Sequence, residues 1–480
     1  MKKTITNLFL VLAFFFAMNA DSNGQTHLWG TTVTGGAHNH GTIYKIKLDG
    51  SNFQTLYSLD SITGYWPFGK LLMANDGNLY GMTAFGGAYN NGVIYKFNLM
   101  TNIYTDIYDF DGTGGIQPYG NLIQATDGNL YGLTSAGTIS NFGTLFSFDI
   151  TTNTYTKLVD FISSNGRYPF GSLMQSNNGK LYGMTNQGGD SSVCFSGCGV
   201  IFSFDIFTNT YSDLSNFNIN LIGADSFGSL IEASNGKLYG MTNQGGPPQD
   251  RGVIFSFDTT TNSAVSLFHF NDTLGRNPRG SLFQSANGKL YGLTRTGGMN
   301  NMGVLFSLDP ANNLYTKLLD LDSTNGKLPY AGLMQASNGK LYGTTHWGGT
   351  GDSGVVFGFD INNNTSTVLL NFNGINGAFP ESDFIEIPDS LTNGINQLPN
   401  KETIMIYPNP ATSTLTLHSP FSILHSQFII TNILGEEIYH QVINNSTQTT
   451  IDVSQWSNGV YFYQIRGDKE TLQGKFVIEK

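Results

Sequence analysis

The residues best suited to chemistry in this 480-residue chain lie in two sets of loops. The first set carries side chains that do not recur along the chain: His38, His40, Arg251, Arg295, His346 and Trp347. The second set adds aromatic and basic side chains: Tyr65, Trp66, Arg167, Tyr168, Arg276 and Arg279. Imidazoles can bind metals, aromatic rings can stack on the apolar faces of sugars, and guanidinium groups can bind carboxylates.

The three loop histidines could bind a metal ion. If the loop of His346 lies beside that of His38 and His40, the three imidazoles could be neighbours. Exposed loop histidines are usually solvated, so we expect no metal and no cofactor, and these three side chains are the candidate ligands should a metal bind.

The two cysteines lie in Cys-Phe-Ser-Gly-Cys, at Cys194 and Cys198. Two sulfurs without a nearby histidine or third cysteine make a poor metal site. In an oxidising compartment the pair is expected to form a disulfide. A loop this short gains little stability from the cross-link, so its role would be local shape.

Catalytic motifs are missing from the sequence. It contains no Gly-x-Ser-x-Gly turn, His-Glu-x-x-His helix or phosphate loop. A glycosidase needs two carboxylates about 5 to 10 Å apart, and the obvious acids in the first loop set are Asp190, Asp250 and Asp352.

We therefore expect no catalytic residue and predict a noncatalytic protein that binds glycan or protein. The predicted ligand-binding side chains are Trp66, Arg295, His346 and Trp347. The alternative is a secreted enzyme acting on polysaccharide, which would require two of the three loop acids to approach each other.

A repeat of about 51 residues must position these loops. Leu-Tyr-Gly recurs with its tyrosine at Tyr80, Tyr131, Tyr182, Tyr239, Tyr291 and Tyr342, and Leu28-Trp29-Gly30 is a seventh copy. Alternation of apolar and small polar residues, as in Val253 to Phe257, predicts strands. Asn-Gly or Asp-Gly pairs between apolar runs predict hairpins with type I′ turns. Four strands per repeat predict the blades of a seven-bladed β-propeller.

Closure separates a propeller from the alternative, an open β-solenoid. The innermost type of strand appears only six times within the repeats. A seventh copy, Phe379 to Glu386, follows the last repeat and aligns with Tyr168 to Gln175. We expect it to pair with the first strand, Thr26 to Thr32, and to close the ring without open edges. The first set of side chains lies in the loops between the second and third strands of the blades, and the second set lies in the loops that join one blade to the next. In a propeller these two kinds of loop open on the same face.

The unit Leu-Tyr-Gly-Met-Thr-x-x-Gly-Gly, followed by Gly-Val-Ile-Phe-Ser-Phe-Asp, resembles the GloVer tandem repeat of exported bacterial proteins. The resemblance covers about residues 26 to 387. It implies a propeller-like fold and says little about activity.

The N-terminal end indicates export. Residues 1–24 combine Lys2 and Lys3 with an apolar run from Leu8 to Ala17 and small residues at its end, as a signal peptide does. No segment is apolar for the roughly 20 residues that span a bilayer, so we expect no transmembrane segment. A net charge of −11 without basic runs argues against a nucleic-acid partner.

The C-terminal end forms a separate module. We expect a propeller at 25–387, a linker at 388–400 and, at 401–480, strand-length alternations that predict a small immunoglobulin-like β-sandwich. Tyr407-Pro408-Asn409-Pro410, Asn432-Ile433-Leu434-Gly435, Trp456 to Tyr461 and a final strand ending in Lys480 resemble the type A sorting domain of the type IX secretion system. An ordinary immunoglobulin-like spacer is the alternative.

The resemblance of this module implies a secreted or cell-surface protein of a Bacteroidetes-type bacterium. It implies that residues 401–480 are recognised by the secretion machinery and removed by its sorting peptidase.

Overall fold

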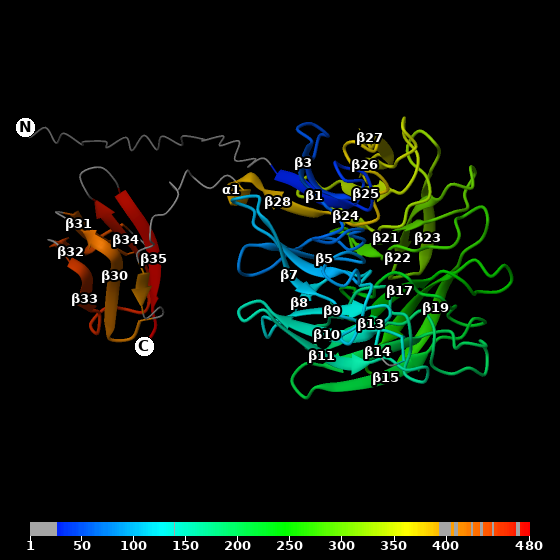
Figure 1. Ribbon diagram of the computed structural model, residues 1–480, viewed down its shortest axis with the longest axis horizontal. Helices are drawn as coiled ribbons and strands as arrows, with labels where there is room; N and C mark the ends of the chain where they lie inside the picture. The colour runs from blue at the N-terminus through cyan, green and yellow to red at the C-terminus, as the bar shows by residue number, and fades with distance from the viewer. Residues whose placement is uncertain are drawn as a thin grey trace, which may run out of the picture. The chain divides into compact units, whose positions relative to one another are not determined.

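The computed structural model describes residues 26–138, 140–392, 405–407, 411–423, 426–432, 435–443, 446–466 and 471–480 (Figure 1). The chain divides into two compact units, Met1–Asn393 and Gly394–Lys480. The predicted signal peptide and most of the predicted linker lie outside the described residues. Within those residues, the only helix is the four-residue α1 (Asp389–Thr392), and no helix has the length and apolar character needed to cross a membrane.

The described part of the first unit contains seven four-stranded antiparallel sheets. Sheet 1 consists of β28 (Ile385–Pro388), β1 (Thr26–Thr32), β2 (Thr42–Lys47) and β3 (Gln54–Ser58). Sheet 2 consists of β4 (Leu72–Met73), β5 (Leu79–Thr83), β6 (Val93–Phe97) and β7 (Tyr104–Asp109). Sheet 3 consists of β8 (Ile123–Gln124), β9 (Leu130–Thr134), β10 (Thr144–Asp149) and β11 (Thr154–Asp160).

The same strand order continues through the remaining repeats. Sheet 4 consists of β12 (Met174–Gln175), β13 (Leu181–Met184), β14 (Val200–Asp205) and β15 (Thr210–Asn216). Sheet 5 consists of β16 (Ile231–Glu232), β17 (Leu238–Thr242), β18 (Val253–Asp258) and β19 (Ser263–His269). Sheet 6 consists of β20 (Phe283–Gln284), β21 (Leu290–Thr294), β22 (Val304–Asp309) and β23 (Leu314–Asp320). Sheet 7 consists of β24 (Leu333–Gln335), β25 (Leu341–Thr345), β26 (Val355–Asp360) and β27 (Thr365–Asn371).

The Leu-Tyr-Gly strands are buried along their whole length because each is the second strand of its sheet and has neighbouring sheets on both faces. Tyr239 and Ile254 of sheet 5, for example, share a core cluster with Leu290 and Phe306 of sheet 6. Leu28 of sheet 1 shares another with Tyr342 of sheet 7. Each sheet thus packs on the next, and the last packs on the first.

The predicted closure of the ring is confirmed. The orange strand β28 lies beside the blue strand β1 in Figure 1, and the two pair antiparallel, with Trp29 opposite Ile385 and His27 opposite Ile387. The Ser382 hydroxyl, just before β28, accepts a hydrogen bond from the Thr31 hydroxyl at 3.0 Å. The two ends of the repeat array therefore share one sheet, which excludes the open solenoid and agrees with a propeller fold.

The hairpins are confirmed, but the predicted type I′ turns are wrong. Gly77 has a positive φ of 79°, whereas Asp76 is not among the residues with positive φ. The N–H of Gly77 donates to the Ala74 carbonyl, and the N–H of Ala74 donates to the Asn78 carbonyl. This pattern is a three-residue loop in which only the glycine is left-handed. Asp76 instead accepts the Tyr80 hydroxyl at 2.8 Å, so its side chain braces the turn.

The two loop sets lie on one face, as predicted. The loop that leads into each inner strand forms a β-bridge with the loop between the second and third strands of the same sheet, as Tyr65 does with Phe85 and Lys327 with Trp347. The predicted disulfide between Cys194 and Cys198 is also confirmed, in the loop between β13 and β14.

The outer strand of sheet 2, β7, carries a half-buried acid, Asp106. Among the described residues, the Asp106 oxygen Oδ1 has no hydrogen-bond partner. Burial raises the pKa of this carboxyl to about 6, and the neighbouring Asp109 adds to the rise. An unfolded chain binds this proton only below a pH of about 4, so the folded ring loses stability as the pH rises from about 4 to about 6.

We therefore expect the melting temperature of Asp106→Asn to lie about 2 to 4 °C above that of the wild type at pH 7.5. At pH 4 the two melting temperatures should be equal, and calorimetry measures both. Asp111→Asn is the matched control. Hydrogen bonds from Thr113 lower the pKa of Asp111, so this variant should melt below the wild type at pH 7.5. A constant difference between Asp106→Asn and the wild type across this pH range would contradict the assignment.

The C-terminal unit contains two sheets in its described residues. One consists of β29 (Met405–Tyr407), β30 (Thr414–Ile423) and β33 (Ser446–Asp452). The other consists of β32 (Glu437–Ile443), β31 (Ser426–Thr431), β34 (Gly459–Arg466) and β35 (Thr471–Ile478). Leu415 and Ile451 of the first sheet share a buried core with Phe428, Ile465 and Phe476 of the second. Two sheets over one core agree with the predicted sandwich.

Candidate functional site

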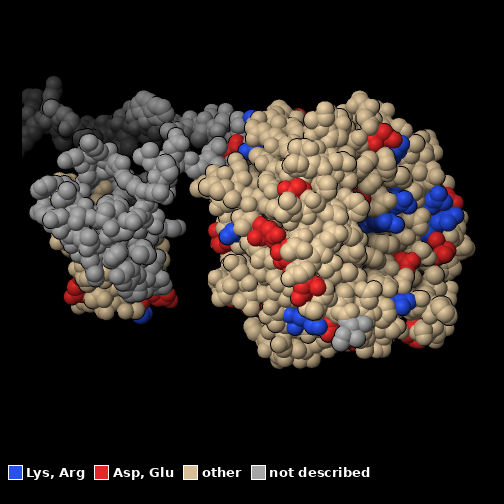
Figure 2. Space-filling model, in the orientation of Figure 1, with Lys and Arg blue, Asp and Glu red and all other residues tan. Residues whose placement is uncertain are grey.

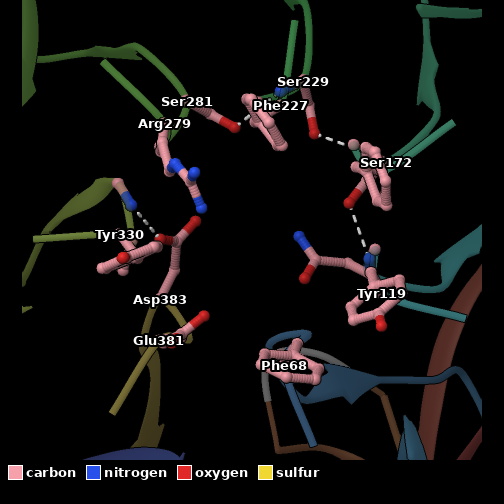
Figure 3. A pocket seen from close by; sticks show the side chains of 18 residues that line it. Phe68, Tyr119, Ser172, Phe227, Ser229, Arg279, Ser281, Tyr330, Glu381 and Asp383 are labelled. Atoms are coloured by element: carbon pink, nitrogen blue, oxygen red, sulfur yellow. Dashed lines mark hydrogen bonds between the residues drawn. The ribbon is translucent and has the colours of Figure 1, made fainter. Parts of the chain in front are cut away.

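A pocket of about 470 Å³ opens where the inner strands of the first unit converge. Figure 3 shows the pocket, which 18 residues line. The loop that leads into each inner strand contributes one residue to the pocket, at the same position in every repeat. We call these seven residues the rim: Phe68, Tyr119, Phe170, Phe227, Arg279, Tyr330 and Glu381. The rim differs from repeat to repeat, which distinguishes it from the repeated residues of the core.

Small residues directly after the rim let the inner strands approach closely. A Cβ atom on Gly120 would lie 2.4 Å from the carbonyl oxygen of Gly171 in the next repeat, so a larger residue does not fit there. Beyond these glycines, the N–H of Asn121 donates to Ser172 Oγ at 2.6 Å, and the N–H of Ser172 donates to Ser229 Oγ at 2.8 Å. These bonds between repeats fix the floor of the pocket.

Four aromatic rings occupy consecutive rim positions, and we call them the aromatic arc. The ring centroids of Phe68 and Tyr119 are 4.9 Å apart, those of Tyr119 and Phe170 are 5.5 Å apart, and those of Phe170 and Phe227 are 5.4 Å apart. Each of these side chains is only partly buried. The arc therefore presents a continuous apolar wall to the pocket.

Two arginines contact Tyr330. The Arg279 guanidinium carbon is 4.4 Å from the Phe227 centroid and 4.9 Å from the Tyr330 centroid, within cation–π range of both rings. Arg295 lies 5.2 Å from the Tyr330 centroid, and its Nε donates to the Tyr330 hydroxyl at 2.9 Å. Burial lowers the pKa of Arg279, yet a guanidinium stays charged at neutral pH.

Two acids complete the pocket. Glu381 Oε1 lies 2.6 Å from His346 Nδ1. The Asp383 carboxylate accepts the Gly332 N–H at 2.5 Å, and burial raises its pKa while the Lys70 charge opposes the rise. Figure 3 shows Arg279 and these acids pointing into the same part of the pocket.

The four predicted ligand residues lie around the pocket and do not line it. Arg295 and His346 contact the lining residues Tyr330 and Glu381. The Trp66 ring lies edge-on to Phe68 at 6.4 Å and is 37% exposed. Trp347 lies further out and packs on His346 at 5.2 Å and on Phe379 at 4.5 Å.

The three candidate metal ligands are not brought together. His346 pairs with Glu381, while His40 Nδ1 bonds to the His38 carbonyl and its ring packs edge-on against Tyr65. In the described ranges no group of three or more His, Cys, Asp or Glu side chains is placed to hold a metal.

Each of the three loop acids contacts a donor close to it. Asp190 accepts the Ser192 N–H, Asp250 accepts the Gly245 N–H, and Asp352 Oδ1 lies 2.9 Å from Lys327 Nζ. None of the three lines the pocket.

Sequence reasoning placed Arg279 in the right loops and missed the other side chains that shape the pocket: Phe68, Tyr119, Phe170, Phe227, Tyr330, Glu381 and Asp383. The signal that could have found the rim is a single variable position, flanked in most repeats by a repeated proline on one side and a repeated glycine on the other.

Two family models match the chain. The Gloeobacter/Verrucomicrobia repeat matches residues 16–195 and 191–402, and the Secretion system C-terminal sorting domain matches residues 405–479. No curated protein matches the chain in sequence.

Several solved structures are similar in fold. A putative 6-phosphogluconolactonase from Bacteroides fragilis is 14% identical with a TM-score of 0.52, over 77% of this chain and 99% of that one. A putative 6-phosphogluconolactonase from Bacteroides uniformis is 14% identical with a TM-score of 0.52, over 76% and 99%. PorZ, a surface component of the type IX secretion system of Porphyromonas gingivalis, is 13% identical with a TM-score of 0.45, and the match spans 92% of this chain but only 64% of PorZ. Identities this low concern the fold alone.

Proposed function

Because the chain belongs to the Gloeobacter/Verrucomicrobia repeat family and carries a sorting domain for export by the type IX system to the cell surface or outside, we propose that it is a noncatalytic glycan-binding protein. Its repeats form a seven-bladed propeller with the ligand site at the axis. Its sorting domain, of immunoglobulin-like type, is removed by the sorting peptidase after passage through the outer membrane.

The aromatic arc is the observation that carries this proposal. Aromatic rings present apolar faces that suit the C–H faces of sugars, and four consecutive rings extend that surface across several sugar units. Hydroxyl and amide groups at the floor, including Ser172 and Asn121, supply hydrogen-bonding partners for sugar hydroxyls. A volume of about 470 Å³ lies in the range of small-ligand sites.

A polysaccharide-acting enzyme is the second candidate, and it rests on the two acids in the pocket. A raised pKa, as at Asp383, suits a general acid. We rank this candidate second because Glu381 is paired with His346 and Asp383 is bonded to the Gly332 N–H. Release of reducing sugar ends by the wild type but not by Glu381→Gln would favour the enzyme.

Phe170→Ala should weaken oligosaccharide binding about tenfold, because it removes one ring from the middle of the arc. The melting temperature should change little, because Phe170 is only partly buried. Titration calorimetry against neutral and acidic oligosaccharides measures the affinity.

Trp347→Ala is the control for this measurement. The sequence alone predicts that it weakens binding, whereas its place outside the pocket predicts a smaller loss than at Phe170. If Phe170→Ala binds every sugar as the wild type does, the arc is not the sugar site.

A further inference from the structure

The basic residues around the pocket fall into two groups. Lys and Arg side chains gather near β21 and β23, with acids beside them (Figure 2). Arg251 and Arg276 both contact Asp272 Oδ1, at 3.0 and 2.8 Å, and Lys327 contacts Asp352. Arg279 and Arg295, by contrast, form no ion pair with any residue that the structure describes. Arg279, whose guanidinium contacts Phe227 of the aromatic arc, thus has no carboxylate partner among the described residues.

No residue that the structure describes forms a hydrogen bond with the Arg279 guanidinium. This group carries five N–H donors, and its Nε is buried without a partner within the described part of the chain. The neighbouring rings of Phe227 and Tyr330 hold the guanidinium in place, but their faces offer no oxygen acceptor for its N–H groups. Holding a charged donor in a partly buried pocket is unfavourable unless an acceptor meets it.

The nearby acids do not supply that acceptor. Glu381 attracts Arg279 but forms its close contact with His346, and no ion pair within 4 Å joins Arg279 to Glu381 or Asp383. Arg295 lies near enough to disfavour the charge on Arg279. An anion bound close to both guanidinium groups would offset their mutual repulsion.

We propose that Arg279, assisted by Arg295, binds the carboxylate of a uronic acid residue in a glycan whose sugar rings lie on the aromatic arc. This inference rests on the proposed function, that the axial pocket binds glycan. A planar carboxylate matches the planar guanidinium fork in a paired hydrogen-bond geometry, which a tetrahedral sulfate matches less well.

The test compares acidic oligosaccharides with their own methyl esters, which keep the sugar rings and lose the charge. Tetramers of galacturonic, glucuronic and mannuronic acid, their esters and a sulfated tetramer are titrated into the exported protein by calorimetry. We expect at least one uronate to bind about tenfold tighter than its ester. Arg279→Gln should remove this preference, because it lowers the affinity for the uronate much more than the affinity for the ester.

Two further variants separate the role of the charge from folding. Arg251→Gln changes an ion-paired arginine outside the pocket and should keep the preference. Arg279→Lys keeps the charge but loses the planar fork, so its preference should be intermediate. If Arg279→Gln does not fold, Arg295→Gln should show a reduced preference in its place.

The outcomes that overturn the two proposals differ. Equal affinity for every uronate and its ester, or the tightest binding to the sulfated tetramer, overturns the carboxylate assignment alone. A preference that survives in Arg279→Gln overturns the role of this residue. Absence of binding to any oligosaccharide overturns the glycan-binding function together with this inference.

Discussion

A chain that ends at residue 379 should fail to form a stable ring. A chain that ends at residue 398 should form a ring with the same melting temperature as the ring of the full-length chain. The shorter chain lacks β28, so β1 loses the partner that pairs with it from Thr26 to Trp29. The inner edge of sheet 1 would then be open. The first and last repeats would keep only their core contacts and a few backbone hydrogen bonds at the loops, such as those between Thr34 and Ala378.

The side chains of this closing segment account for the size of the effect. Phe384 is 3% exposed and packs edge-on against Tyr44 at 6.4 Å, and Ile387 is 1% exposed. Losing two such apolar side chains costs roughly 4 to 10 kcal/mol, against a total stability of roughly 5 to 15 kcal/mol. The Thr31 hydroxyl would also lose its bond to Ser382.

Calorimetry and tryptophan fluorescence on the two truncated chains measure this prediction. Phe384→Ala in the full chain is the intermediate case and should remain folded with a clearly lowered melting temperature. The matched surface control is Ile375→Ala, because Ile375 is 85% exposed and should have little effect. Equal melting temperatures for the chains ending at 379 and 398 would show that β28 does not close the ring.

The sequence was informative about the ring because the repeat carries its own physical signals. Leu238 to Thr242 is buried at every position, as expected for a strand inside a sheet that has neighbours on both faces. The unmatched strand after the last repeat identified β28, because six inner strands cannot complete seven sheets. The turn type was mistaken because Asn-Gly and Asp-Gly also suit loops in which only the glycine is left-handed.

The pocket was harder to predict because its residues are far apart in sequence. Phe68 and Tyr119 are 51 positions apart, and their rings meet only once the inner strands converge on the axis. Sequence reasoning favoured rare side chains in long loops, such as His346 and Trp347. These two pack on each other and on Phe379, so they support the rim from outside.

The separate fold of the C-terminal unit leads to the second large effect. Residues 399–480 fused to a foreign secreted protein should carry it to the surface of, or out of, a bacterium with type IX machinery, and the fused domain should be cut off. The same fusion that ends at residue 470 should stay in the periplasm. Surface labelling and blotting of cell fractions distinguish these locations.

The difference between the two fusions follows from the last strand. Strand β35 pairs with β34 along eight residues, and Phe476 and Ile478 are almost fully buried in the core of this unit. Removing them exposes the core and the edge of β34, so the sorting domain should not fold. Lys480→Ala is the milder control, because it removes the hydrogen bonds from Lys480 Nζ to the carbonyls of Ser454 and Trp456 but keeps β35 in the sheet. Equal export of both fusions would show that secretion does not require the folded domain. Retention of the longer fusion in the periplasm would contradict the sorting role of residues 399–480.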